Sequence, residues 1–407
     1  MAAFVELITI RRGNSKYFQY IFEAKFKEIT GLDSLHSVPS NRSGIYLLLT
    51  ALGIGKGDEV ILTGYTCSAV TEPIVELGAV PIYADITADN YCLNIASLEK
   101  LISPKTRVII AQHTYGIAAP ILEIVKVAEK HQIFLIEDCA LALGSKLNGS
   151  WLGTYGDAGI WSFELSKTIS VGWGGIIGVR NNSELSKKIT QLIDFYGKQP
   201  RFLAAQRLIQ AGISGLLYRA NTPFILRHYL IGLLFQIGLF RSSKNTPAHD
   251  LRMPSDFQWR FLTNQLNSLD KILERHKLAA SVYLNVLKKF IEVPESIKNS
   301  NLIRFPLVVK NREKMINYFA QKDIEIGRWF DSPVSGGKLL NIGYVRGSCP
   351  VSEYVTEHIV NLPLHARLTS PQIKNIAECL CEYFKKYPDE LKGVESDFRA
   401  IIKSEMQ

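Results

Sequence analysis

The sequence lacks the patterns that mark several common protein classes. Its six cysteines among 407 residues are scattered, with no CxxC pair and no histidine at zinc-finger spacing. They therefore predict neither a metal site nor a disulfide framework, and reduced thiols in a cytosol are the expectation. No charge-free apolar run reaches the roughly 18 residues that a membrane-spanning helix needs. The chain begins MAAFVELITIRRG, whose short apolar part contains Glu6, so we expect no secretory signal.

Excess positive charge is confined to one segment. Lysine and arginine total 47 and aspartate and glutamate total 38, which gives a net charge of +9. Nine basic residues and one acidic residue lie between Lys187 and Asn245, so that segment carries +8 of this charge. The rest of the chain is close to neutral, which argues against a nucleic-acid partner.

Hydrophobic residues make up 47% of the chain, enough for a large core and too many for a mainly disordered protein. Short apolar, β-rich runs alternate with amphipathic stretches in the first half. We expect strands at 58–64, 80–86, 107–113, 133–138, 158–164 and 174–180, and helices at 16–30, 45–52, 70–78, 96–102 and 121–131. This alternation predicts an α/β fold with a mainly parallel sheet covered by helices on both faces.

The second half has a different organisation. An apolar period near 3.6 predicts one long helix over 255–290. A smaller α+β unit follows, with a strand at 302–309 and helices at 312–322 and 371–386. We therefore divide the chain into a large α/β domain (1–254, with an insertion at about 187–245), a connecting helix (255–290) and a small C-terminal domain (291–407).

Two glycine-rich stretches do not predict a nucleotide-binding loop. LGIGKGDE (52–59) follows a predicted helix and precedes a strand, the reverse of the order that points a helix N-terminus at a pyrophosphate. VGWGG (171–175) also leads into a strand, and neither stretch has the Lys-Ser/Thr pair of a phosphate-binding loop. A nicotinamide- or ATP-dependent enzyme is therefore disfavoured.

A carboxylate and a lysine follow two of the predicted strands. IEDCA places Asp138 at one strand end, and SFELSK places Ser162 and Lys167 at and after another. Open α/β sheets bind ligands at the carboxyl ends of their strands. Pyridoxal 5'-phosphate (PLP) chemistry needs these two groups, a lysine that links to the cofactor and moves protons and an acid that pairs with the pyridine nitrogen. On spacing alone, a helix cap at Asp138 and a solvated Lys167 explain the pattern equally well.

The order of the motifs resembles one family. SNRSGIYLLLTAL, GYTCSAV, TRVIIAQHTYG, IEDCALALGS and SFELSKTISVGWGG follow one another between Ser40 and Arg180 as in the DegT/DnrJ/EryC1/StrS nucleotide-sugar aminotransferases. Shorter stretches of the C-terminal half, such as GRWFDSP and VNLPLHARLTSPQI, are similar to the same family. The resemblance implies a fold-type-I PLP enzyme. Such an enzyme would move an amino group from an amino acid, expected to be L-glutamate, to a keto group of a nucleotide-activated sugar.

The resemblance also implies roles for individual residues. By position, Lys167 would be the Schiff-base lysine and Asp138 the partner of the pyridine nitrogen. Ser162 and the Arg42-Ser43 turn would bind the cofactor phosphate, for which the helix start at SNRSG (40–44) is also suited. A lysine at 167 favours transamination, because the family's sugar dehydratases carry histidine there. The family further implies a cytoplasmic homodimer with shared sites, in amino-sugar or surface-polysaccharide biosynthesis.

Some positions depart from the family pattern. Leu141 stands where the family usually has a glutamine near the cofactor hydroxyl, and Cys67 where an aromatic ring usually stacks on the cofactor. The Asn-Tyr-Arg that normally reaches the partner's cofactor phosphate is absent, and MPSDFQ (253–258) lies roughly in its place. These departures motivate an alternative function, a non-catalytic cofactor-binding or scaffold protein at an envelope-polysaccharide assembly.

Three further residues are weaker candidates for lining a substrate pocket. His113 follows a strand, where a site-lining or capping role is favoured over that of a general base. Trp329 in GRWFDSP is an ordinary core residue or a wall of a sugar pocket, and His365 is a structural or a site-lining histidine. No group in the sequence predicts a metal site.

The stretch FILRHYLIGLLFQIGLF (224–240) is the most apolar part of the basic segment. No formally charged side chain follows Arg227 within it, yet the stretch is too short to span a bilayer. Two interpretations stay open. The stretch either packs on the protein as part of a helical pair, or it makes a peripheral contact with an anionic membrane.

Overall fold

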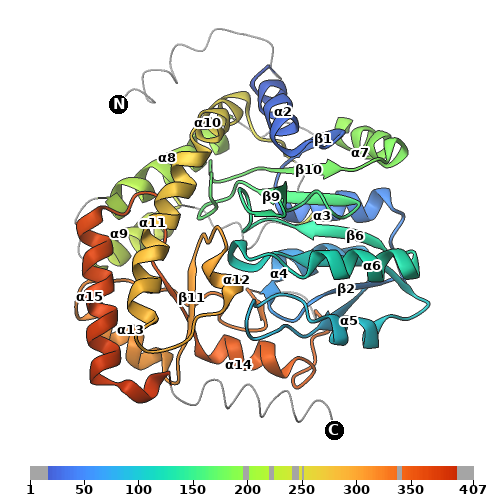
Figure 1. Ribbon diagram of the computed structural model, residues 1–407. Coiled ribbons are helices and arrows are strands. Elements are labelled where there is room, and N and C mark those ends of the chain that lie inside the picture. The colour runs from blue at the N-terminus through green and yellow to red at the C-terminus, as the bar shows by residue number, and fades with distance from the viewer. Residues whose placement is uncertain are drawn as a thin grey trace.

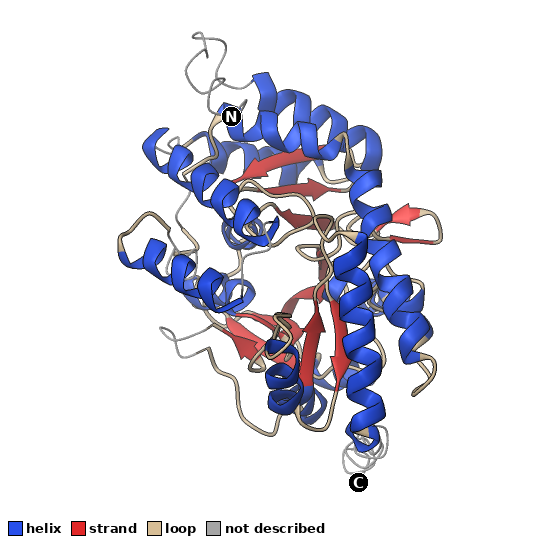
Figure 2. Ribbon diagram, turned by 90° about the vertical axis from the view of Figure 1, so that its left-hand side faces the viewer, coloured by secondary structure: helices blue, strands red, loops and turns tan. Residues whose placement is uncertain are grey.

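A seven-stranded sheet forms the centre of the molecule (Figures 1 and 2). The computed structural model describes residues 17–195, 201–219, 224–240, 247–249, 252–336 and 342–391. The strands are ordered β1-β10-β9-β6-β5-β2-β4. Their bounds are β1 Ser34–Val38, β2 Glu59–Thr63, β4 Val80–Ala84, β5 Thr106–Gln112, β6 Phe134–Asp138, β9 Ala158–Ser162 and β10 Gly175–Val179. Only β10 runs against its neighbours in this sheet, so the mainly parallel sheet expected from the sequence is confirmed.

Helices cover both faces of the sheet. One face packs against α3 (Asn41–Ala51), α4 (Ser68–Glu76) and α7 (Ser183–Asp194). The other packs against α5 (Ile95–Leu101), α6 (Ile121–His131), α2 (Tyr17–Thr30) and α10 (Asp256–Leu266). Strand side chains alternate between the two layers: Val108 and Ile110 lie in the first core, and Ile109 lies in the second. Burial on both faces explains why these strands are continuous apolar runs in the sequence.

The C-terminal part adds a small two-stranded antiparallel sheet of β11 and β13. The helices and strands of the C-terminal part are α11 Leu269–Leu287, α12 Glu295–Lys298, β11 Phe305–Val308, α13 Arg312–Ala320, α14 Pro350–His358, β13 Ile359–Leu362 and α15 Ser370–Lys386. Tyr65 and Tyr115 from the first half of the chain belong to the same apolar core as these elements. The two parts are therefore packed together, and the domain limits at 254 and 290 stay a prediction.

The prediction of a single helix over 255–290 is wrong. α10 and α11 are separate helices, with Asn267 and Ser268 between them. Leu266 and Leu269 are both buried, so the apolar pattern continues across the break and hides it. The sequence prediction also omitted β1, β13 and α14. β1 pairs on one side only and is short and partly polar, which weakens its signal.

The basic segment forms two helices, α8 (Arg201–Arg219) and α9 (Phe224–Gln236). Large apolar side chains of this pair are exposed to solvent, namely Phe202, Leu216, Leu226, Tyr229, Leu233 and Phe235, together with Ile237 just beyond α9. Within the described ranges, no helix is both long and apolar enough to cross a membrane.

Candidate active site

The carboxyl ends of β6 and β9 bring two predicted site residues to one edge of the sheet. The strands are parallel neighbours, with Asp138 opposite Ile160. Asp138 is the last residue of β6 and Ser162 the last of β9, and both are buried. Lys167 lies in the loop that follows β9. The sheet topology thus confirms that these residues share one end of the sheet, as the sequence predicts.

The start of α3 lies against the same part of the sheet. The Ser43 N–H donates to Ser40 Oγ at 3.1 Å, and the two hydroxyl oxygens are 2.9 Å apart. A Cβ on Gly44 would approach Ile160 Cδ1 within 2.4 Å, so a glycine lets α3 pack closely on β9. Two hydroxyls and a helix N-terminus are therefore held beside the end of β9, an arrangement suited to an anion.

Asp138 is a buried carboxylate with a defined set of donors. Its Oδ1 accepts hydrogen bonds from Asn41 Nδ2 at 3.1 Å and from the Ala140 N–H at 2.9 Å. Burial raises the pKa of Asp138, while the Ala140 N–H, the charge of Lys167 and the Asn41 hydrogen bond act in the opposite direction. A carboxylate in this setting favours a cationic or protonated partner.

Lys167 opens onto a cavity of about 740 Å³ and is the one lysine among the described residues that line it. Burial lowers the pKa of Lys167, whereas the charges of Glu164 and Asp138 raise it. Burial thus favours the neutral amine, which is the form that acts as a nucleophile or base.

Cys67 lies close to the charged side chains of Arg42 and Lys167. Cys67 directly precedes α4, and burial raises the pKa of its thiol, with the charges of Lys167 and Arg42 opposing that effect. Arg42 Nε lies 2.8 Å from Glu72 Oε2, which fixes the arginine between α3 and α4. The structure thus brings Arg42, Cys67 and Lys167 together, as the resemblance implies. Leu141 is buried in the turn after Asp138.

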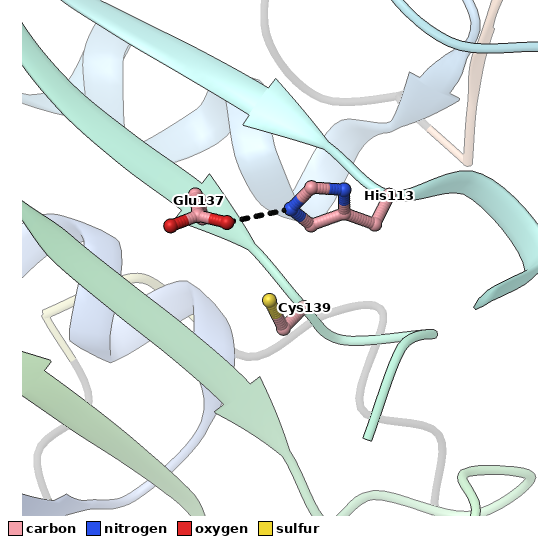
Figure 3. A group of neighbouring side chains, drawn as sticks. All are labelled: His113, Glu137 and Cys139. Carbon is pink, nitrogen blue, oxygen red and sulfur yellow. Dashed lines mark hydrogen bonds and ion pairs between the residues drawn. The ribbon is translucent and has the colours of Figure 1, made fainter. Parts of the chain in front are cut away.

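His113 lies in a buried hydrogen-bonded network, and Figure 3 shows its contact with Glu137. Its Nδ1 accepts from the Ala119 N–H at 3.1 Å, so Nε2 carries the proton and donates to Glu137 Oε2 at 2.9 Å. The Glu137 oxygens also accept the N–H groups of Tyr155, Gly156 and Gly153 at 2.6 to 2.8 Å. His113 is therefore a structural residue here and is not part of the described cavity lining.

Cys139 completes a cluster with His113 and Glu137 that has the composition of a metal site (Figure 3). Both ring nitrogens of His113 and both oxygens of Glu137 already take part in hydrogen bonds. Burial raises the pKa of Cys139 well above its ordinary value, which disfavours the thiolate. These three side chains form a structural network and offer a metal ion no open ligand position.

The remaining candidates lie in different places. His365 lines the cavity with Lys167. Trp329 packs beside the cavity, and its carbonyl accepts hydrogen bonds from Tyr65 and Tyr115. The cavity also contains Arg304, which the sequence analysis missed. A charged residue inside the apolar run LIRFPLVV was the signal that could have identified Arg304.

Comparisons with known proteins agree with this geometry. A family model described as the DegT/DnrJ/EryC1/StrS aminotransferase family matches residues 12–381. The chain is 28% identical over 371 residues to GDP-perosamine synthase of Escherichia coli O157:H7, covering 89% of each protein. It is also 28% identical over 371 residues to the UDP-N-acetyl-3-dehydro-alpha-D-glucosamine 3-aminotransferase of Acidithiobacillus ferrooxidans, covering 86% of this chain and 85% of that protein.

A solved structure supports the fold. The crystal structure of a DegT DnrJ EryC1 StrS aminotransferase from Brucella abortus superimposes with a TM-score of 0.73 at 22% identity, over 94% of this chain and 93% of that one. The resemblance drawn from the sequence motifs is thereby confirmed. Since the family model matches nearly the whole chain, the protein belongs to the DegT/DnrJ/EryC1/StrS aminotransferase family.

Proposed function

We propose that this aminotransferase uses PLP to move an amino group from L-glutamate to the keto group of a nucleotide-activated sugar. The observation that carries the proposal is that Asp138 ends β6 and Lys167 follows the neighbouring strand β9, close enough for the charge of each to act on the other. PLP supplies an aldehyde that takes up the amino group and a pyridine ring that accepts the electrons of a broken C–H bond.

The residues present fit this cofactor. Asp138 is buried among neutral donors and would pair with a protonated pyridine nitrogen. Oδ1 of Asn41 is also buried and has no hydrogen-bond partner among the described residues, as expected beside a polar group that the chain does not supply. Ser40, Ser43 and Ser162 would hold the phosphate at the start of α3, with Arg42 nearby as a positive charge.

Lys167 would move the proton in each half of the reaction. Its Nζ would take a proton from the donor Cα and deliver it to the cofactor C4′, then reverse these roles with the sugar. Burial lowers the pKa of Lys167, so more of the amine is neutral at pH 7 than for a solvated lysine. The neutral amine is the form that can accept the proton.

The proposed acceptor class rests on the relatives. Both matched enzymes have names that refer to nucleotide-linked sugars, one carried by GDP and one by UDP. A ketone is the group that transamination converts to an amine. We therefore propose a nucleotide-linked keto-sugar for amino-sugar or surface-polysaccharide biosynthesis. The non-catalytic alternative has no support in the site, because Lys167 and Asp138 are in place despite Leu141 and Cys67.

Direct transfer of labelled nitrogen tests the function. The protein would be loaded with PLP and mixed with [15N]-L-glutamate and GDP- or UDP-linked keto-sugars, and the products examined by mass spectrometry. The proposal requires a 15N-amino sugar and 2-oxoglutarate in equal amounts. Conversion of glutamate without transfer to any sugar would contradict the acceptor class, and no conversion of any amino donor would contradict the activity.

We also propose a cytoplasmic homodimer in which the partner completes each site. The chain lacks the Asn-Tyr-Arg expected near residues 253–258, so another partner segment would have to reach the cofactor phosphate. Light scattering of the PLP-loaded protein measures the mass directly. A monomer with full amino-transfer activity would contradict this assembly.

The exposed apolar side chains of α9 and of the residue that follows it support a peripheral membrane contact. Leu226, Tyr229 and Ile237 are 48%, 68% and 65% exposed, in the segment that carries most of the net positive charge. Apolar side chains can enter the headgroup region while arginines meet anionic lipids, at about 1 kcal/mol each. The test is flotation with anionic and neutral vesicles, with Tyr229→Ser/Ile237→Ser as the variant and Leu278→Ser, which is 54% exposed on α11, as the control. Equal, negligible binding to both vesicles would reject the contact.

A further inference from the structure

Arg304 lies directly beside the reactive lysine. Its Nη2 donates to the Oγ of Ser166 at 3.2 Å, and Ser166 immediately precedes Lys167 in the chain. Arg304, Ser166 and Lys167 all line the cavity of about 740 Å³. Arg304 precedes β11, so the fold of the C-terminal part carries a second positive charge to the loop after β9. This charge also acts to lower the pKa of Lys167, an effect smaller than that of burial.

The guanidinium of Arg304 is held in a fixed place. It lies over the ring of Trp329, 4.7 Å from the ring centroid, in a cation–π contact. Trp329 is itself held in position, because its backbone N–H donates a hydrogen bond to Asn361 Oδ1 at 2.8 Å. Its carbonyl accepts hydrogen bonds from Tyr65 and Tyr115. A planar cation positioned in this way is already oriented before any substrate binds.

The donor has one negative group that must lie next to Lys167. The proton that Lys167 removes is on Cα, and the α-carboxylate is bonded to the same carbon. A carboxylate matches the two parallel N–H donors of a guanidinium, whereas a lysine would offer only a point charge. We propose that Arg304 binds the α-carboxylate of the amino donor and so places the donor Cα at Lys167. This inference rests on the proposed function and extends it.

Other charges in the cavity do not take this position. Arg227 enters the cavity from α9, and its Nη2 lies 2.7 Å from Glu325 Oε2. Arg367 lines the cavity as well, and its charge acts on His365. In contrast, Arg304 donates to Ser166 next to Lys167, and its charge acts on that lysine. Arg304 is therefore the arginine that belongs to the lysine end of the cavity.

The acceptor makes a different demand. The carbonyl carbon of a ring keto-sugar is bonded to two ring carbons and to no carboxylate. Arg304 should therefore matter more for the half-reaction with the amino acid than for the half-reaction with the sugar. This difference separates binding of the donor carboxylate from a general effect on the cofactor or on the cavity.

The test compares Arg304→Gln with Arg107→Gln, a control at an exposed arginine of β5 outside the cavity lining. The PLP-loaded proteins would be titrated with L-glutamate and with its α-amide, L-isoglutamine, measuring both binding by calorimetry and single-turnover conversion of the cofactor. Loss of a charge-assisted pair corresponds to about a 10- to 100-fold loss. We expect that loss for glutamate in Arg304→Gln, little change for isoglutamine, and little change for either donor in Arg107→Gln.

The two readouts separate this inference from the proposed function. Unchanged binding of glutamate by Arg304→Gln, or an equal loss for both donors, would overturn the role of Arg304. A loss confined to the reaction of the aminated cofactor with the sugar would overturn it as well. If the wild-type protein binds glutamate through Arg304 without converting the cofactor, the carboxylate role stands and the proposed amino transfer fails.

Discussion

Asn41 Nδ2 donates a hydrogen bond to Asp138 Oδ1 at 3.1 Å, which joins the first turn of α3 to the end of β6. The Ala140 N–H donates to the same oxygen at 2.9 Å. Among the described residues, Oδ1 thus accepts both hydrogen bonds that are donated to this carboxylate. The carboxylate is held in one orientation, with Oδ2 directed to its other side.

Asp138→Asn should keep this local structure and lose the charge. The amide oxygen can accept from both Asn41 and Ala140, which leaves the NH2 group where Oδ2 was. An NH2 group cannot pair with a protonated pyridine nitrogen. A hydrogen bond to a charged group contributes about 1.5–3 kcal/mol, so we expect conversion of PLP by glutamate to slow by about 10- to 100-fold. An unchanged single-turnover rate constant would contradict the role of Asp138.

Glu164→Gln should shift the pH dependence of the half-reaction with the sugar, in which Lys167 starts as a free amine. The charge of Glu164 raises the pKa of Lys167, so removing the charge lowers that pKa further. The reaction needs the neutral amine, hence the rate rises with pH through the lysine pKa. The rising limb should therefore move to lower pH in Glu164→Gln and stay in place in the exposed control Glu184→Gln. A shift to higher pH, or none, would contradict this electrostatic coupling.

Glu137→Gln should destabilise the protein. The two carboxylate oxygens accept three backbone N–H groups and His113 Nε2, and the amide would set an NH2 group against some of these donors. Each buried donor left without a partner costs about 1–3 kcal/mol. We expect a lower thermal midpoint than for the wild type, with the exposed Glu129→Gln as control. Equal midpoints for the two variants would refute the structural role of this network.

Residues at the ends of strands could be predicted from the sequence. Asp138, Ser162 and Lys167 follow apolar runs that alternate with helices, and a parallel sheet must place the ends of such runs at one edge. Hydrogen-bond partners across the fold could not be predicted in the same way. Asn41 reaches Asp138 because α3 packs on the sheet, and the sequence separation of the two residues carries no sign of that contact.

Residues supplied by the C-terminal part were harder to predict. Arg304 reaches Ser166 only because β11 and its flanking loop pack against the first half of the chain. His113 was expected as a capping or site-lining residue, and its buried pairing with Glu137 depends on the register of β5 and β6. The sequence pattern did not reveal the end of α10 before Asn267, because the leucines on both sides of the break are buried and continue the apolar period.

The central claim is that Lys167 carries PLP and gives it up to an amino donor. Borohydride reduction of the PLP-loaded protein, followed by peptide mapping, locates the cofactor on a lysine. We expect the reduced cofactor on Lys167, none on that peptide after treatment with excess L-glutamate, and none in Lys167→Ala of unchanged fold. Labelling of a different lysine, or label that remains on Lys167 after every amino donor, would contradict the claim.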